Sequence, residues 1–146
     1  MAIWVVSAFF GAILSGRMTK KLARIRLLAL AYLISGLAAL VFAFSYQNIV
    51  LAISSLLVNG FSVSITYPAT YSELAAYLGE GSVRRGAAFG ILFSSQIAGS
   101  SILGFASGYL ASGYGLQLPF VIAAVMLVSS IGTVFIWART HKSLSV

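Results

Sequence analysis

The sequence predicts an all-α fold: a polytopic transmembrane helix bundle with five spans. Of its 146 residues, 60% are hydrophobic and 8% are charged, whereas a soluble domain carries about 25% charged residues. The nine basic and two acidic residues gather in three short clusters, and the stretches between these clusters are long enough to cross a membrane. This composition excludes a water-soluble domain, because too little polar surface remains to cover a core.

The charged clusters divide the chain into its elements. They consist of Arg17, Lys20, Lys21, Arg24 and Arg26, then of Glu73, Glu80, Arg84 and Arg85, and finally of Arg139 and Lys142. A spanning helix needs about 20 apolar residues, so the charge-free stretches 27–72 and 86–138 each hold two spans. Polar breaks at 45–48 and 112–117 predict the turns between them. We therefore expect one transmembrane domain, residues 1–146, with spans at about 2–16, 27–45, 48–72, 86–111 and 118–138.

The positions of the charges also predict an orientation in the cell membrane. Five spans place all three charged clusters on one side, which the positive-inside rule assigns to the cytoplasm. The N-terminus is then outside and the C-terminus inside. The first apolar segment, from Met1 to Gly16, is only about 24 Å long at 1.5 Å per residue, against a hydrocarbon core of about 30 Å. We interpret it as a chain that starts within a helix, as a fragment or one half of a larger protein would.

The sequence lacks the residues that several functional classes require. The chain has no cysteine and a single histidine, His141, so neither a metal site nor a bound cofactor is expected. No His, Asp or Glu falls within a span, which leaves no catalytic residue and argues against an enzyme. The net charge of +7 would suggest nucleic acid for a soluble protein, but the charges flank apolar spans. The expected partner is therefore the lipid bilayer and not nucleic acid.

Three segments are similar to loops of the major facilitator superfamily of transporters. Residues 11–21 (GAILSGRMTKK) resemble its cytoplasmic loop pattern G-x-L-A-D-R-x-G-R-R/K. Residues 68–73 (PATYSE), followed by Arg84, Arg85 and Gly86, resemble the loop between the fourth and fifth helices of a half. Residues 113–120 (GYGLQLPF) resemble the outer turn before the last helix of a half. Their order, spacing and sidedness agree with the family over nearly the whole chain.

The resemblance implies a fold and a function. The family has two six-helix halves, and this chain resembles helices 8 to 12, in the C-terminal half. Gly16 and Thr19 replace the family's Asp and second Gly, and such degeneracy is common in the second half. The implied function is part of a secondary-active transporter that moves a small solute by alternating access. An N-terminal half, or self-association, would complete it; the alternative is a standalone structural or homo-oligomeric membrane protein without transport.

A polar stripe in the span 48–72 supplies the candidate substrate site. Its members recur at spacings of four and three, which places them on one helix face: Ser55, Asn59, Ser62, Thr66 and Thr70, continued by Glu73. Polar residues in a span usually face the protein interior or a water-filled cavity, and by resemblance this span lines the transport cavity. Asn59, near mid-membrane, is the first candidate, followed by Ser62, Thr66 and Ser55. Alternatively, the hydroxyls bond within their own helix and Asn59 joins two helices; Gln96 has the same two interpretations.

The charged loops have two interpretations as well. By resemblance, Arg17, Lys20 and Lys21 form salt bridges that latch the outward-open transport state. Glu73 and Glu80, on the same side, are possible partners for Arg84, Arg85 or Arg17. Alternatively, the basic residues only fix the topology and contact anionic lipid.

Two further patterns concern helix geometry. Pro68 cannot donate a backbone N–H, so we expect it to kink the span 48–72 or to end the helix near Tyr67. Small residues along the span 86–111 predict a helix-packing seam: Gly86, Gly90, Ser100, Gly104 and Gly108. Aromatic residues near the span ends, including Tyr32 and Trp137, are interpreted as an interfacial belt without chemistry.

Overall fold

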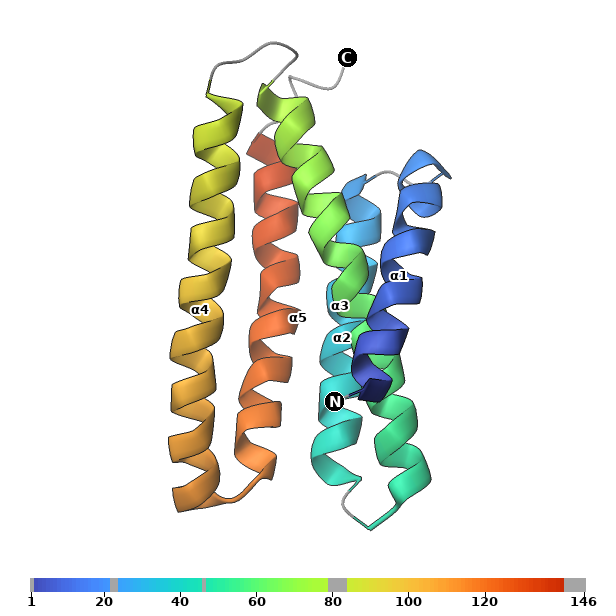
Figure 1. Cartoon of the computed structure of the whole chain (residues 1–146), viewed down its shortest axis with the longest axis vertical. Coiled ribbons are helices and arrows are strands. Elements are labelled where there is room, and N and C mark those ends of the chain that lie inside the picture. Colours follow the sequence, from blue (N-terminus) through green and yellow to red (C-terminus); the bar gives the residue numbers. More distant parts are fainter. Residues whose placement is uncertain (1, 22–23, 46, 79–83, 141–146) are drawn as a thin grey trace.

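The computed structural model describes residues 2–21, 24–45, 47–78 and 84–140, and within these ranges it contains five α-helices (Figure 1). They are α1 (Ala2–Lys21), α2 (Arg24–Phe44), α3 (Ile49–Leu78), α4 (Arg85–Tyr114) and α5 (Gln117–Thr140). The predicted all-α membrane bundle is thus confirmed. Four of the described helices hold a stretch long and apolar enough to cross a membrane: Ile25–Phe44, Ile49–Leu78, Arg85–Tyr114 and Gln117–Trp137. The apolar part of α1, Val5–Gly16, is shorter.

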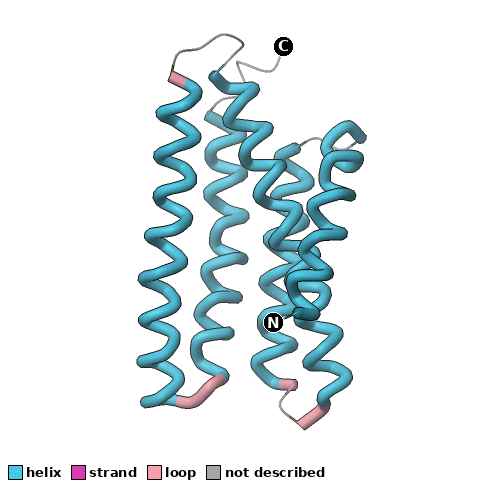
Figure 2. The backbone as a smooth tube through the Cα atoms, viewed as in Figure 1, coloured by secondary structure: helices cyan, strands magenta, loops and turns pink. Residues whose placement is uncertain are grey.

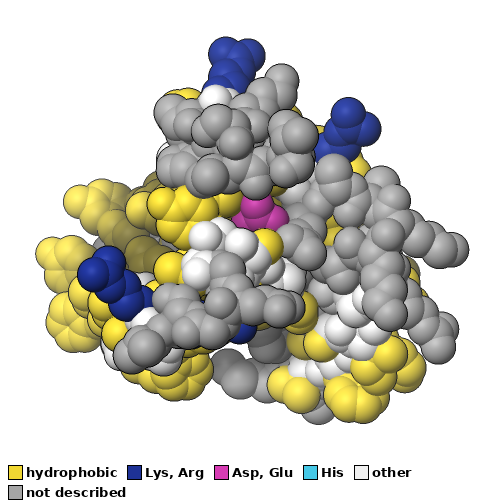
Figure 3. All heavy atoms as spheres, turned by 90° about the horizontal axis from the view of Figure 1, so that it is seen from above, with side chains coloured by type: hydrophobic (Ala, Val, Ile, Leu, Met, Phe, Trp, Pro, Cys, Tyr) yellow, Lys and Arg dark blue, Asp and Glu magenta, His cyan; other side chains and the backbone are white. Residues whose placement is uncertain are grey.

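Consecutive helices run in opposite directions, as the tube in Figure 2 shows. Helices α1, α3 and α5 therefore end where α2 and α4 begin. We call this the basic end, because it carries the described side chains of Arg26, Arg84, Arg85 and Arg139. Figure 3 views this end and shows basic side chains around its edge. The predicted gathering of the charged clusters on one side of the bundle agrees with this arrangement.

The turns at the opposite end follow from their residues. The side-chain Oδ1 of Asn48 accepts hydrogen bonds from the backbone N–H groups of Val50 and Leu51, each at 3.1 Å, and so caps the start of α3. Gly115 ends α4 with a φ of +93°, which glycine adopts readily, and its N–H bonds to the carbonyl of Ala111. Both turns lie where the polar breaks in the sequence predict them.

Helix α2 lies at the centre of the packing. It contacts α3 on one side and α5 on the other, while α1 packs mainly on α3 and α4 stands at the edge beside α5 (Figure 1). The buried core joins three residues of α2 to two of α3: Leu27, Leu28, Ala31, Ile65 and Ala69. No residue of α4 is buried. The bundle therefore has a packed side, α1 to α3 with α5, and a loosely attached α4.

Small residues bring the packed helices close together. Ser7, Gly11 and Ser15 are buried at every fourth position of α1. A Cβ atom at Gly11 would overlap the hydroxyl of Ser64 and the carbonyl oxygen of Phe61 in α3. At the contact between α2 and α5, a Cβ at Gly36 would lie 2.9 Å from a methyl carbon of Val128. Small residues at these crossings allow close backbone approach in lipid.

The main departure from expectation concerns Pro68. Helix α3 continues through it to Leu78, so the expected helix end near Tyr67 is wrong. A proline leaves one carbonyl without its intrahelical donor, and neighbouring helices make this tolerable in a membrane. Ile65 and Ala69, on either side of Pro68, are both buried against α2. This packing holds the helix in register across the missing hydrogen bond.

We expect Gly11→Ala to destabilise the bundle by about 1–3 kcal/mol, the usual cost of overfilling a packed site, because the added methyl meets Ser64 and Phe61. Thermal unfolding in detergent, followed by circular dichroism, measures the effect. Gly104→Ala is the matched control, since nothing lies within 4 Å of its Cβ position. Equal melting temperatures for Gly11→Ala and wild type would contradict the close contact between α1 and α3.

Candidate functional site

Asn59, the first candidate for substrate contact, lies between α3 and α2. Its amide nitrogen donates to the backbone carbonyl of Ser35 at 3.1 Å and to the Ser35 hydroxyl at 3.0 Å. Ser35 itself is fully buried. This is the geometry of the alternative in which Asn59 joins two helices. Substrate contact by Asn59 stays a prediction.

The hydroxyls of the polar stripe bond largely within α3. Ser55 donates to the carbonyl of Ala52 at 2.9 Å, and Thr66 to that of Val63 at 2.6 Å. Both side chains are buried, as is Ser62. Such bonds satisfy a hydroxyl without a ligand. Ser55, Ser62 and Thr66 thus lie in the helix packing and line no cavity that the structure describes.

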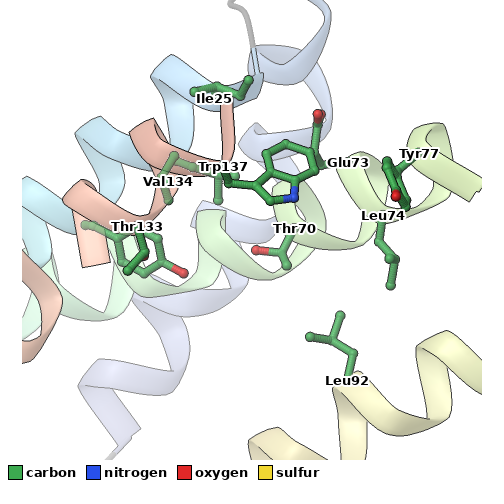
Figure 4. Close-up of a pocket in the computed structure, with 11 residues that line it drawn as sticks. Ile25, Thr70, Glu73, Leu74, Tyr77, Leu92, Thr133, Val134 and Trp137 are labelled. Carbon is green, nitrogen blue, oxygen red and sulfur yellow. The ribbon is translucent and has the colours of Figure 1, made fainter. Parts of the chain in front are cut away.

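The last two members of the stripe reach a cavity at the basic end. It has a volume of about 560 Å³ and lies among α2, α3, α4 and α5 (Figure 4). Five of its eleven lining residues are aliphatic, from Ile25 of α2 to Leu92 of α4. The polar and aromatic groups that line it are Tyr32, Thr70, Glu73, Tyr77, Thr133 and Trp137. The stripe therefore leads from the packed α2–α3 contact into an open space.

Aromatic residues connect the helices around this cavity. Tyr32 of α2 and Thr70 of α3 both line it, and the Thr70 hydroxyl donates to the carbonyl of Thr66 at 2.7 Å. The rings of Tyr77 in α3 and Trp137 in α5 meet edge to face, with centroids 6.3 Å apart. In Figure 4, the Trp137 ring extends from α5 toward α3, beside Thr70 and Glu73. The cavity wall thus combines one carboxylate with three aromatic residues and two threonines.

Gln96 connects α3 to the loosely held α4. The Tyr71 hydroxyl donates to its Oε1 at 3.2 Å. The Tyr71 ring also lies 5.6 Å from that of Phe89, between centroids. This position fits the interpretation of Gln96 as a link between helices, and its contact with a substrate stays a prediction.

The charged residues of the loops are described in part. Arg85 donates through Nη2 to the carbonyl of Ala75 at 3.3 Å, and so places a positive charge at the C-terminal turn of α3. Glu73 lines the cavity, whereas Arg84 is exposed. The side chains of Arg17, Lys20 and Lys21, together with Glu80, lie outside the described residues. The proposed latch among these charges is therefore untested.

The predicted packing seam of α4 is open in this chain. All five of its residues are exposed: Gly86, Gly90, Ser100, Gly104 and Gly108. A Cβ added at any of the four glycines would meet nothing within 4 Å. The packing role of the seam stays a prediction, and any partner for it lies beyond the described part of the chain.

Sequence reasoning missed the aromatic part of the cavity. Tyr32 and Trp137 were assigned to an interfacial belt, and Tyr77 was not singled out. One signal was available, because Glu73 and Tyr77 are four residues apart and so share a helix face. The contribution of Trp137 could not be foreseen, since it depends on α5 packing beside α3 across some sixty intervening residues.

Comparison with known proteins gives one match. The family model described as Major Facilitator Superfamily matches residues 1–145 and so covers all five helices. No curated protein and no solved structure matches the chain.

The Asn59–Ser35 contact predicts an energetic coupling between α3 and α2. In a double-mutant cycle with Asn59→Ala and Ser35→Ala, we expect a coupling of about 0.6 kcal/mol, the average for hydrogen bonds between membrane helices. Unfolding of each variant in detergent gives the four free energies. Ser55→Ala paired with Asn59→Ala is the control cycle, because the Ser55 hydroxyl bonds to Ala52 within α3. Additive effects of Asn59→Ala and Ser35→Ala would show that the hydrogen bond to the Ser35 hydroxyl contributes nothing.

Proposed function

The chain belongs to the major facilitator superfamily, and we propose that within this family it is the C-terminal half of a secondary-active transporter, helices 8 to 12. The superfamily consists of membrane transporters and not of enzymes. In our proposal the chain moves a small solute by alternating access, together with an N-terminal half that supplies the facing wall of the transport path. That half is a separate chain or the missing part of one longer chain.

The observation that carries this proposal is the combination of composition and exposure in α4. This helix is the least apolar of the four candidate spans, yet it has no buried residue. Lipid penalises polar surface, so a span facing lipid on most sides is expected to be among the most apolar. Its open glycines are of the kind that let membrane helices pack closely. We infer that the glycine-lined face of α4 docks against the N-terminal half.

The polar stripe of α3 supplies the proposed substrate contacts. Asn59 lies near the middle of the predicted span 48–72, and transporter substrates bind near the bilayer midplane. Its amide nitrogen donates to Ser35 in the described state. A substrate acceptor at this nitrogen would therefore compete with Ser35. Ser55, Ser62 and Thr66 on α3, and Gln96 on α4, are the further proposed contacts.

The basic end is proposed to face the cytoplasm, with the N-terminus outside and the C-terminus inside, by the positive-inside rule. Around it, Arg17, Lys20 and Lys21 would alternate between anionic lipid and the acidic residue Glu73 during transport. The Arg85 side chain already joins the start of α4 to the last turn of α3. These contacts are candidates for gating.

A homo-oligomeric membrane protein without transport is the second candidate function. The same α4 face favours it, because two copies of a small-residue stripe can pack against each other. The two functions differ in what they require, since transport needs an N-terminal half and self-association does not.

Assembly with an N-terminal half tests the proposed function. The DNA upstream of Met1 is sequenced, and any first-half spans that it encodes are co-expressed with the chain. We expect the two parts to purify together and, in liposomes, to exchange at least one member of a panel of radiolabelled sugars, amino acids and organic cations. The chain alone should exchange none of them.

Two variants test whether α4 forms the interface with the N-terminal half. Gly104→Leu should abolish co-purification while leaving the chain folded, because the Cβ position of Gly104 is unoccupied in the chain alone. Ser95→Leu, at another exposed position of α4, should leave assembly unchanged. Dimers of the chain alone that exchange no probe, with or without an N-terminal half, would favour the structural alternative.

A further inference from the structure

We propose that α4 is a hinged helix whose position beside α3 is set by Tyr71. In the described position, Tyr71 holds the half of α4 nearest the basic end against α3. When this contact is released, that half of α4 moves away from α3 by rotation about Gly115, while α1, α2, α3 and α5 stay packed together. The movement involves only residues of this chain, so it depends neither on transport nor on an N-terminal half.

The hinge lies at the end of α4 opposite the basic end. Helix α4 ends at Tyr114 and α5 begins at Gln117, so two residues connect them. Gly115 has a φ of +93°, a region that glycine enters without the steric penalty of a Cβ atom. Hinges in proteins are usually a few residues that absorb a change in φ and ψ. Gly115 can therefore change conformation while both helices stay intact.

Helix α4 is the least tightly packed of the five described helices (Figure 1). None of its thirty residues is buried. By contrast, α2 and α3 share the buried core, and Gly11 and Gly36 bring α1 against α3 and α2 against α5. Elements with few buried contacts open at a lower free energy than the core does. A movement of α4 therefore leaves the packed side of the bundle unchanged.

Tyr71 joins α3 to two turns of α4. Its hydroxyl donates to Oε1 of Gln96 at 3.2 Å, and its ring centroid lies 5.6 Å from that of Phe89. Phe89 and Gln96 are seven residues apart, which places both on the same face of α4. Arg85 adds a further contact through its 3.3 Å hydrogen bond to the carbonyl of Ala75. These contacts lie in the half of α4 nearest the basic end, so their loss releases that half and leaves the hinge in place.

Distances between spin labels, measured by double electron–electron resonance on the purified full chain in detergent, test the proposal. The chain has no cysteine, so labels attach only to introduced cysteines. One pair is Leu30→Cys on α2 and Ala87→Cys on α4, two exposed positions toward the basic end. We expect a main distance from the described position of α4 and a minor, longer distance from the released position.

Variants at the contact should change the ratio of the longer to the main distance. Tyr71→Phe removes the hydroxyl and keeps the ring, so the ratio should rise about threefold, the equivalent of the average of about 0.6 kcal/mol for a hydrogen bond between membrane helices. Gln96→Leu removes the acceptor of the same bond and should have the same effect, with no further rise in the double variant. Tyr71→Ala also removes the ring contact with Phe89, so we expect a rise of about tenfold.

Matched controls separate this movement from a general loosening of the bundle. Tyr109→Phe removes a hydroxyl from an exposed tyrosine of α4 and should leave the ratio unchanged. A pair of labels at Leu30 of α2 and Phe135 of α5, both exposed, reports on the packed side. Its distance should be the same in Tyr71→Ala as in wild type.

A further pair of labels locates the hinge. Val41 on α2 and Phe105 on α4 are exposed and lie toward the hinge end, and their distance should change less than that between Leu30 and Ala87.

Four outcomes overturn the proposal. They are unchanged distances between Leu30 and Ala87 in the Tyr71→Ala variant, equal changes at the two ends of α4, a change between α2 and α5, and an effect of Tyr109→Phe equal to that of Tyr71→Phe. Since the measurement uses the chain alone, its failure leaves the transport proposal standing. Failure of co-purification with an N-terminal half, in turn, leaves the hinge standing.

Discussion

The structure depends on one constraint: within a lipid bilayer, a polar group must find its partner inside the protein. The chain meets this constraint in two ways. Hydroxyls such as those of Ser55 and Thr66 bond to carbonyls of their own helix, so they can lie in a tight interface without a donor or acceptor from elsewhere. Asn59 has more hydrogen-bonding groups than its own turn can use, and it crosses to Ser35 of the neighbouring helix.

The same constraint explains why small residues determine which helices pack closely together. Helices in lipid gain little from burying apolar side chains, because lipid is itself apolar, so close van der Waals contact matters more. Gly11 lets α1 meet the backbone of α3, and Gly36 lets α2 meet α5. At these crossings the buried surface consists of main-chain atoms and small side chains. Helix α4, which forms no such crossing within the described chain, is correspondingly loose.

The sequence was sufficient to predict where the helices lie along the chain, but not which helices pack against one another. Charged clusters and polar breaks locate the helix ends, because charges and turns are costly in hydrocarbon. The extension of α3 beyond Pro68 was missed, because it depends on the burial of Ile65 and Ala69 against another helix. The periodicity of the α3 stripe gave the correct set of residues on one face, yet only packing shows which of them lie between helices and which, like Thr70 and Glu73, line a cavity. A stripe of small residues likewise does not reveal its partner, and that of α4 has none in the described chain.

The two-residue connection between α4 and α5, residues 115–116, has a mechanical consequence. So short a connection fixes the lower end of α4 beside α5, whatever the rest of the helix contacts. Toward the basic end, the described hydrogen bonds that hold α4 against α3 are those from Tyr71 to Gln96 and from Arg85 to Ala75. A bond between neutral groups is worth about 0.5–1.5 kcal/mol and one with a charged donor about 1.5–3 kcal/mol. A rotation of α4 about Gly115 would therefore displace its basic end most, where Leu92 lines the cavity, and would change the width of the cavity.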